Sequence, residues 1–557
     1  MSLKPMPIPP VPPDTVRVAR AAFRKGNLYL KLRDELGTLV QDSDFVSLFA
    51  KEGFPALPPW RLALVTILQF REQLSDRQAA EAVRARIDWK YLLSLELSDA
   101  GFDFSVLSEF RARLINGGAE ELLLEKLLEW SRAAGLVKAR GKQRTDSTHV
   151  VAAIRLLNRV ELVGETLRAA LNELAVLAPD WVRAIAPPEW YERYRQRSEE
   201  GRLPKTTEAR EAYARRVGED GFWLLDAVDA AATLPVLREV ASIKTLRRVW
   251  QQHYERLTPP HGGGASQPQV RWKELRELPR AAEQLESPYD VDARYCTKHS
   301  TRWEGYKVHY TETCDLDNVY LITDVQTTPA TLHDIHCTAP IQATLQRRGL
   351  LPQEHIVDAA YIDAAVLVSS RQEHGITLVG PPRPNSSWHT KLEGGYTREQ
   401  FTVEWEQRQV RCPQGKVSSS WTERGMSTLT PSISVHFRRQ DCTPCPTRAL
   451  CTRSPRQPRH LNLLPRTQFE ALHTARTQQH SKEGQELYKR RAGIEGTLSH
   501  GVRSFGLRRS RYRGLKKTHL QHVMTAVAMN VGRIVAWFAH MPRAKTRVSR
   551  FAALVAS

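Results

Sequence analysis

Hydrophobic periodicity divides the first quarter of the chain into short helices. Residues 60–70, WRLALVTILQF, are apolar on nearly every face, as in a buried helix. The SDRQ sequence at 75–78 matches a capping box and predicts a second helix that runs to Arg86. Residues 103–105 can cap a third helix. These helices fit a plain bundle or a helix-turn-helix DNA reader, and periodicity favours the bundle.

The pattern changes at residues 143–152, QRTDSTHVVA, where β-branched residues surround a single acid as in a short strand. A long helical stretch follows, and strand patterns return at 305–313 and 319–326. Helix and strand patterns then alternate: helix near 334–348, strand at 355–359, helix near 362–374 and strand at 376–380. This alternation after an initial meander predicts an α/β protein with a mixed sheet.

The same patterns divide the chain into segments. We expect a disordered Pro-rich leader (1–27), an N-terminal all-helical domain that binds DNA ends (28–135), a core in two parts (136–153 and 286–399), a long helical insertion (154–285), a small β-rich insertion that carries cysteines (400–465), a C-terminal helical and basic segment (466–540) and a basic tail (541–557).

The charge balance narrows the choice of partner. The chain has 81 Lys and Arg against 61 Asp and Glu, a net charge of +20. Such a surplus favours a polyanionic partner such as nucleic acid, although a solvated basic surface would give the same count. No apolar run is long enough for a membrane span, and the leader lacks the apolar core of a signal peptide. Seven cysteines, an odd number, favour a reducing cytoplasm over a secreted disulfide framework.

Two acids stand inside otherwise apolar strand patterns. Burying an unpaired charge is costly, so Asp146 and Asp358 are candidate ligands of a metal ion. Two-metal phosphodiester chemistry needs two or three carboxylates that converge from separate elements, and Mg²⁺ suits such sites. Either acid alone could equally be an edge-strand or turn residue.

A third acid is predicted on a late helix. Tyr488, Arg491 and Glu495 fall at positions i, i+3 and i+7, which places them on one helical face. Glu495 could bind the metal, while Tyr488 and Arg491 could contact phosphate or orient the carboxylate. An ordinary salt-bridged surface helix would show the same spacing. The competing acids, which we rank behind these three, are Asp324, Asp363, Glu483 and Glu486.

Two further segments carry candidate chemistry. Cys412, Cys442, Cys445 and Cys451 supply four thiolates in two groups, which suits a structural Zn²⁺, although four reduced cysteines in a loop fit the spacing too. Residues 503–517, RSFGLRRSRYRGLKK, hold seven basic residues and no acid. We expect this run to grip DNA through Arg503, Arg508, Arg509, Arg511, Arg513, Lys516 and Lys517. In the apolar helix that follows, Asn530 and Arg533 are expected to be structural.

Seven short motifs in a fixed order resemble the DDE transposases of bacterial insertion sequences. The motifs are LSDRQAA (74–80) with IDWKY (87–91), LSEFRARL (107–114), TDST (145–148), GYKVH (305–309), VDAAY (357–361), RRAGIEGT (490–497) and GLRRSRYRG (506–514). The specific resemblance is to the group numbered eleven-eighty-two, among the relatives of the insertion-sequence four and five families. The related signature Tyr-x2-Arg-x3-Glu-x6-Lys is matched by Tyr488, Arg491 and Glu495, but Val502 stands at its Lys position, with Arg503 next to it.

The resemblance implies an RNase H-like fold with Asp146 on the first strand, Asp358 after the fourth and Glu495 on a late helix. It further implies a DNA transposase that uses two Mg²⁺ (or Mn²⁺) ions to cleave the ends of the element and transfer the strands. Its partners would be double-stranded DNA, both terminal inverted repeats and target, and a second copy in a homodimer or larger synaptic complex. It would work in the cytoplasm at the bacterial nucleoid.

Two other functions fit the same residues. The chain could be a catalytically inactive transposase derivative that binds DNA as a regulator, or an RNase H-like metal-dependent nuclease that acts on other substrates.

Overall fold

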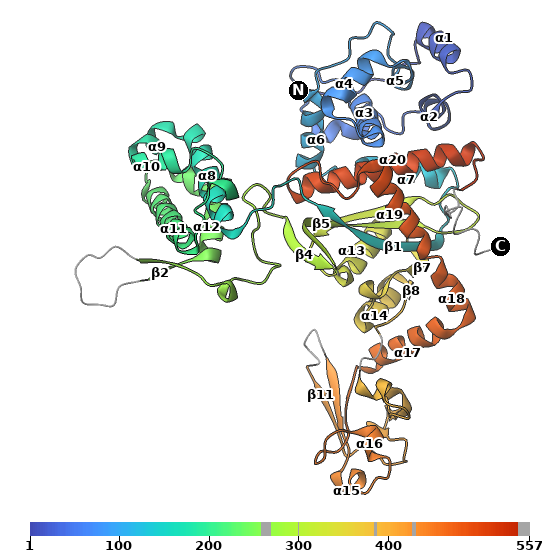
Figure 1. The fold of residues 1–557 in the computed structure, drawn as a ribbon. Coiled ribbons are helices and arrows are strands. Elements are labelled where there is room, and N and C mark those ends of the chain that lie inside the picture. Colours follow the sequence, from blue (N-terminus) through green and yellow to red (C-terminus); the bar gives the residue numbers. More distant parts are fainter. Residues whose placement is uncertain (258–268, 299, 384–386, 426–430, 544–557) are drawn as a thin grey trace, which may run out of the picture.

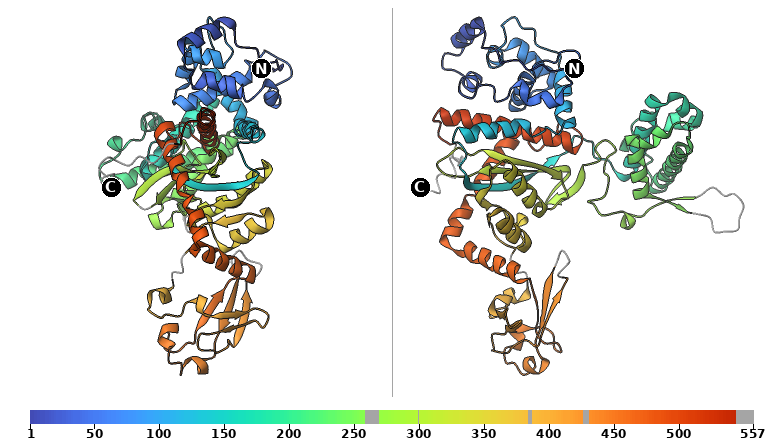
Figure 2. Two further views of the ribbon diagram at one scale, coloured as in Figure 1. Left: turned by 90° about the vertical axis from the view of Figure 1, so that its right-hand side faces the viewer. Right: turned by 180° about the vertical axis from the view of Figure 1, so that it is seen from behind.

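The computed structural model describes residues 1–257, 269–298, 300–383, 387–425 and 431–543. A central sheet is flanked by the N-terminal helices on one side and by a small β-rich insertion on the opposite side, and a helical insertion projects laterally (Figures 1 and 2). Most of the expected basic tail, and the Pro- and Gly-rich loop within the helical insertion, lie outside the described residues. The fold class is mixed α/β.

The sheet has six strands and mixed direction. In chain order the strands are β1 (Arg140–Val151), β4 (Arg294–Lys298), β5 (Thr301–Thr313), β6 (Ile322–Pro329), β7 (Pro352–Ile356) and β8 (Thr377–Val379). β5 runs antiparallel to β1, β4 and β6, whereas β7 runs parallel to both β1 and β8. The predicted strands are therefore confirmed. The structure adds the short edge strand β4, so β7, which precedes Asp358, is the fifth strand of this sheet in chain order rather than the fourth.

Helices cover the sheet and tie it to the N-terminal region. They include α13 (Thr338–Arg347), α14 (Ala364–His374) and the long, largely buried α20 (Leu515–Phe538). α20 packs on β6 and also on two N-terminal helices, α3 (Pro59–Glu72) and α7 (Leu122–Ala133). One continuous hydrophobic core contains Trp60 of α3, Tyr310 of β5 and Val527 of α20. The N-terminal helices thus share their core with the sheet.

The remaining N-terminal helices are short. They are α1 (Pro13–Ala22), α2 (Leu28–Leu36), α4 (Asp76–Ala85), α5 (Ile87–Leu92) and α6 (Ser105–Asn116). The predicted capping box of α4 is confirmed, since Ser75 and Gln78 bond each other's backbone N–H.

The prediction of a disordered leader is wrong for α1. The Thr15 side chain is buried and its hydroxyl donates to the Leu95 carbonyl at 2.8 Å. Ala19 is also buried, and the Ser2 N–H donates to the Phe54 carbonyl at 2.8 Å. Contacts with residues far along the chain therefore order a segment whose proline content suggested disorder.

The two insertions have cores of their own. The helical insertion contains α8 (Arg159–Leu177), α9 (Pro179–Ile185), α10 (Pro188–Arg193), α11 (Thr207–Ala230), α12 (Ala241–His253) and a hairpin of β2 (Tyr254–Leu257) and β3 (Gln269–Trp272). Sequence patterns did not indicate the hairpin. The β-rich insertion contains β9 (Thr402–Glu404), β10 (Gln409–Arg411), β11 (Ser420–Arg424), β12 (Ser432–His436) and β13 (His460–Leu463), with one-turn helices α15 (Arg439–Cys442) and α16 (Arg448–Cys451).

The chain returns to the sheet through α17 (Arg466–His480), α18 (Lys482–Lys489) and α19 (Ala492–Phe505). Among the described residues, no helix combines the length and the apolar character needed to cross a bilayer.

A buried carboxylate joins four of these elements. Glu312 on β5 is fully buried and lies directly opposite Arg144 on β1, which donates to it from Nε at 2.8 Å and from Nη2 at 2.6 Å. Thr497 of α19 and Arg533 of α20 donate to its other oxygen at 2.6 and 2.9 Å. Arg533 and Asn530 are thus structural, as predicted, since Asn530 pairs with both backbone groups of Ile322.

This network generates a stability prediction. Glu312→Ala leaves the buried Arg144 guanidinium without its counter-ion, so we expect the free energy of unfolding to fall by about 3–5 kcal/mol. Urea unfolding followed by tryptophan fluorescence measures the loss. Glu283→Ala, at an exposed glutamate, is the matched control and should change stability by less than about 0.5 kcal/mol. Equal losses in the two variants would show that the network does not stabilise the fold.

Candidate active site

Asp146 and Asp358 lie at the same level of two neighbouring parallel strands. Arg144 on β1 pairs in register with Ile356 on β7, and each acid follows two residues later. Neighbouring strands lie about 4.8 Å apart, so this register brings the two acids side by side. Asp358 stands just past the end of β7, where its carboxylate accepts the Ala360 N–H at 2.8 Å. The structure therefore brings together the two strand acids that the sequence singled out.

The charge of one acid affects the other. Burial raises the pKa of Asp146 above its usual value, and the negative charge of Asp358 raises it further. The Ser147 N–H and Arg491 act in the opposite direction without cancelling the increase. A cation bound beside Asp146 would stabilise its ionised form, which burial and the charge of Asp358 disfavour.

Arg491 places a positive charge between Asp146 and the third predicted acid. Its Nη1 donates to Asp146 Oδ2 at 2.8 Å, and its Nη2 donates to Glu495 Oε1 at 2.5 Å. The Asp146 side chain is 16% exposed, whereas that of Glu495 is 60% exposed. Tyr488 lies nearby, with its ring centroid 6.0 Å from Arg491 Cζ. The guanidinium thus occupies a position between two carboxylates that suits a cation.

Metal ligation is not preformed. Across the parts of the chain that the structure describes, no group of three or more His, Cys, Asp or Glu side chains is arranged to hold a metal ion. Glu495 is held by Arg491 and does not complete a three-carboxylate site with the two strand acids.

The prediction that one continuous helix carries Tyr488, Arg491 and Glu495 is wrong. Tyr488 belongs to α18, Arg491 lies between the helices and Glu495 belongs to α19. At the junction the Arg490 carbonyl accepts a hydrogen bond from Arg144 Nη1 at 2.5 Å. It also accepts one from the Gly493 N–H, three residues later, at 3.2 Å, so the turn is tighter than an α-helix. Arg144 from the sheet thus contacts this tightened turn, and Arg491 within the turn reaches Asp146.

The competing acids have other partners or positions. Asp324 is fully buried and pairs with Arg348 at 3.2 Å, and burial raises its pKa to about 6. Asp363 caps α14 by accepting the Val366 N–H at 2.8 Å. Glu486 is an exposed partner of Lys489, and Glu483 is exposed on the same helix.

The basic segment after α19 lies along the end of β1. Arg508 Nε donates to Thr148 Oγ1 at 2.8 Å, and a β-bridge joins Arg509 to Val151. Arg511 donates to the Leu74 carbonyl at 2.9 Å and Arg513 lies over the Tyr289 ring at 5.1 Å. Arg503, Lys516 and Lys517 are exposed. Several cations predicted to grip DNA therefore also anchor the segment beside the Asp146 strand.

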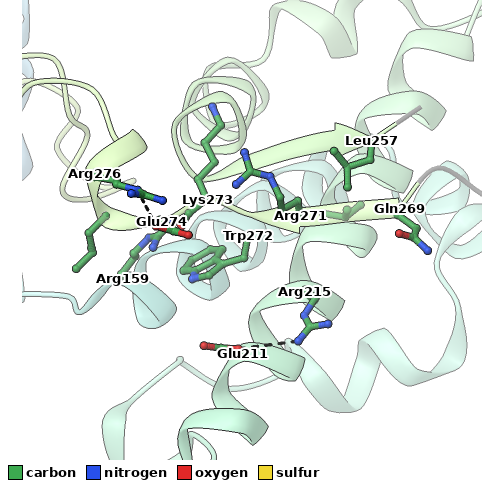
Figure 3. Close-up of a pocket in the computed structure, with 12 residues that line it drawn as sticks. Arg159, Glu211, Arg215, Leu257, Gln269, Arg271, Trp272, Lys273, Glu274 and Arg276 are labelled. Carbon is green, nitrogen blue, oxygen red and sulfur yellow. Dashed lines mark hydrogen bonds and ion pairs between the residues drawn. The ribbon is translucent and has the colours of Figure 1, made fainter. Parts of the chain in front are cut away.

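Basic residues also gather in the helical insertion, where they line a concavity of about 740 Å³ (Figure 3). Arg159 stacks over the Trp272 ring there, with Cζ 3.8 Å from the centroid. Most of its other cations have acidic partners: Arg215 with Glu211, Arg276 with Glu274 and Arg271 with Glu277. Its charge is thus largely neutralised within the insertion, unlike that of residues 503–517.

Sequence reasoning missed Arg144 and Glu312, which position the site without belonging to it. Arg144 stands two residues before Asp146 and therefore on the same face of β1. This spacing was the signal from which the role of Arg144 could have been predicted, since a long basic side chain next to a buried acid can reach a helix packed on the same face of the strand.

Gly493 offers a test of this positioning. A Cβ at Gly493 would lie 2.1 Å from Arg144 Nη1, whereas a Cβ at Gly496, one turn along α19, meets no atom within 4 Å. We expect Gly493→Ala to displace Arg144 and destabilise the protein by about 1–3 kcal/mol. Gly496→Ala should be neutral or stabilising by up to about 1 kcal/mol. Thermal and urea unfolding of both variants measure the effect, and equal stability would contradict the close approach.

Comparison with known proteins gives two matches. Residues 18–113 match the family model described as Transposase domain (DUF772), and residues 411–535 match the model described as Transposase DDE domain. The second match includes Glu495 but neither Asp146 nor Asp358. No curated protein and no solved structure matches the chain. Both models describe transposase domains, and the chain is similar to them over these two stretches, one near each end of the sequence.

Proposed function

We propose that the protein is a transposase of the eleven-eighty-two group that cleaves and transfers DNA strands at the ends of an insertion sequence, with Asp146, Asp358 and Glu495 as its catalytic acids. The observation that carries the proposal is the parallel pairing of β1 with β7, in which Arg144 lies opposite Ile356 and each acid, Asp146 and Asp358, follows two residues later. Arg491 links Asp146 to Glu495, so all three acids belong to one neighbourhood.

The sheet supports an RNase H-like core. Its strands β6, β5 and β1 are antiparallel neighbours, and β1, β7 and β8 are parallel neighbours. In this arrangement the first acid lies on the central strand and the second follows the adjacent parallel strand. The helix with the third acid packs on β1.

The donor set fits Mg²⁺ or Mn²⁺. Carboxylate oxygens are the ligands these ions prefer, and the guanidinium between Asp146 and Glu495 shows that the acids accommodate positive charge. Two bound ions would activate the attacking oxygen and stabilise the leaving oxygen of the phosphodiester. Asp146 and Asp358 would hold the ions, and Glu495, freed from Arg491, would supply the third carboxylate.

The released Arg491 and the basic segment would then contact DNA. Arg491 and Tyr488 lie beside the acids, where a phosphate must lie for cleavage. Arg503, Arg508, Arg509, Arg511, Arg513, Lys516 and Lys517 would neutralise phosphates of double-stranded DNA at the terminal inverted repeats. Hydrolysis frees a 3′-OH, which attacks target DNA in line. Because both ends must be cut together, we propose that a homodimer or larger synaptic complex performs the reaction.

One experiment separates this proposal from its alternatives. Purified protein is incubated with Mg²⁺ and a DNA fragment that carries the ends of the element. Cleavage at the ends followed by joining to target DNA supports the transposase. Binding without cleavage would favour an inactive regulator, and cleavage without joining would favour an RNase H-like nuclease.

The three acids should be indispensable. We expect Asp146→Ala, Asp358→Ala and Glu495→Ala each to lower the cleavage rate about 1000-fold or more, equivalent to roughly 4 kcal/mol in the barrier, because each removes a proposed metal ligand. Gel assays on end-bearing DNA measure the rates. Asp363→Asn, which keeps a side-chain oxygen for the α14 cap, is the control and should cleave normally. Wild-type activity in Asp358→Ala would refute the assignment.

Arg491 should compete with the metal. We expect Arg491→Ala to tighten Mn²⁺ binding about 5-fold or more in the absence of DNA, because the guanidinium no longer neutralises Asp146 and Glu495. Titration followed by the electron paramagnetic resonance of free Mn²⁺ measures the affinity. Arg503→Ala, at an exposed arginine of α19, is the matched control and should leave Mn²⁺ affinity unchanged. Weaker or unchanged binding in Arg491→Ala would show that the guanidinium does not occupy the cation position.

A further inference from the structure

Four cysteines of the β-rich insertion surround one cavity. The cavity has a volume of about 210 Å³, and the residues that line it include Cys412, Cys442, Cys445 and Cys451. Cys412 follows β10, Cys442 ends α15, Cys451 ends α16 and Cys445 lies in the link between these helices. These four positions surround one cavity in the part of the insertion that carries α15 and α16, far from β1 and α19 (Figure 1).

The turn at Cys412 presents its sulfur as an acceptor. The Gly415 N–H donates to the Cys412 carbonyl at 2.8 Å, and the Lys416 N–H donates to Cys412 Sγ at 3.3 Å. Gly415 has φ +79°, a conformation that L side chains rarely adopt. The turn thus holds the Cys412 sulfur beside the cavity as a hydrogen-bond acceptor.

The four thiols share the wall of one cavity. All four cysteines are partly buried and none is in a disulfide. Lys416, Arg448 and Arg459 also line the cavity, where Arg459 and Arg448 donate to the backbone carbonyls of Cys451 and Ser454 respectively. A cation bound among the four sulfurs would stabilise them as thiolates, the form that binds metals.

We propose that Cys412, Cys442, Cys445 and Cys451 bind one structural Zn²⁺ in this cavity. Four sulfur ligands match the closed tetrahedral sites of structural zinc. As they stand, the thiols line the cavity without forming a ligand cluster, so binding requires their side chains to turn inward.

Histidines do not compete for this site. His436 and His460 stack on each other, with ring centroids 4.4 Å apart, and both bond to Ser434. Neither lines the cavity.

The ion would stabilise a unit with little core of its own. Among the described residues of the insertion, seven hydrophobic residues form its buried core: Phe401, Val410, Ile433, Val435, Phe437, Leu461 and Leu463. A core of this size gives little stability by itself, and a metal is one of the usual supplements. In the sequence, the insertion lies between β7, the strand that precedes Asp358, and α19, the helix that carries Glu495.

The test uses full-length protein purified without chelators from zinc-supplemented cells. Elemental analysis should find one zinc per chain, and a mercurial reagent should release it to a chromogenic chelator. Cys442→Ser/Cys445→Ser should lose the zinc, whereas Cys296→Ser, which alters a partly exposed cysteine outside the insertion, should retain it. Chelation should also open the insertion to limited proteolysis.

A second measurement does not depend on the folding of a variant. Wild-type protein that is stripped of zinc and reloaded with Co²⁺ should show the near-ultraviolet sulfur-to-cobalt charge-transfer band of tetrathiolate sites. Substoichiometric zinc together with absence of this band would overturn the proposal. So would disulfides among these four cysteines in freshly purified protein, or full zinc content in the double variant.

Discussion

The buried ion pair between Arg144 and Glu312 is the constraint on which the rest of the structure depends. A carboxylate with no solvent exposure is tolerated only when it is fully hydrogen-bonded, and Glu312 meets this condition by drawing groups from β1, α19 and α20. Arg144 has a second task, since it also binds the carbonyl of Arg490. One side chain therefore joins the sheet to the helices and fixes where α19 begins.

The position of α19 determines the electrostatics of the site. Because the helix is interrupted before Ala492, Arg491 points at Asp146 rather than along a continuous helical face. The resulting series of charges, Asp358, Asp146, Arg491 and Glu495, is balanced only in part, because the one guanidinium pairs with two of the three carboxylates, Asp146 and Glu495. Divalent ions would complete the neutralisation, and a DNA phosphate would offer Arg491 a new partner. In the proposed function, this arrangement would couple metal binding and DNA binding through Arg491.

Local patterns predicted the elements well, and long-range contacts explain what they missed. The strand that contains TDST, the strand that ends just before VDAAY and the buried α3 follow from alternation, β-branching and apolar runs, which depend on near neighbours in sequence. The break before α19 depends on Arg144, more than 300 residues away, and the order of α1 depends on Leu95. The spacing of Tyr488, Arg491 and Glu495 could indicate which residues meet, but not that two helices present them.

The same limit applies to partners. Net charge pointed to nucleic acid, yet it could not separate the basic segment beside β1 from the charge-paired concavity of the helical insertion. That distinction depends on which arginines have acidic neighbours, and those neighbours come from other elements.

The most direct test is a crystal structure of the protein bound to end DNA and Mn²⁺, with the ions located by anomalous scattering. Our account predicts two peaks about 3.5–4 Å apart, contacted by Asp146, Asp358 and Glu495, with Arg491 moved onto a phosphate. Ions bound elsewhere, while Arg491 still joins Asp146 to Glu495, would contradict it.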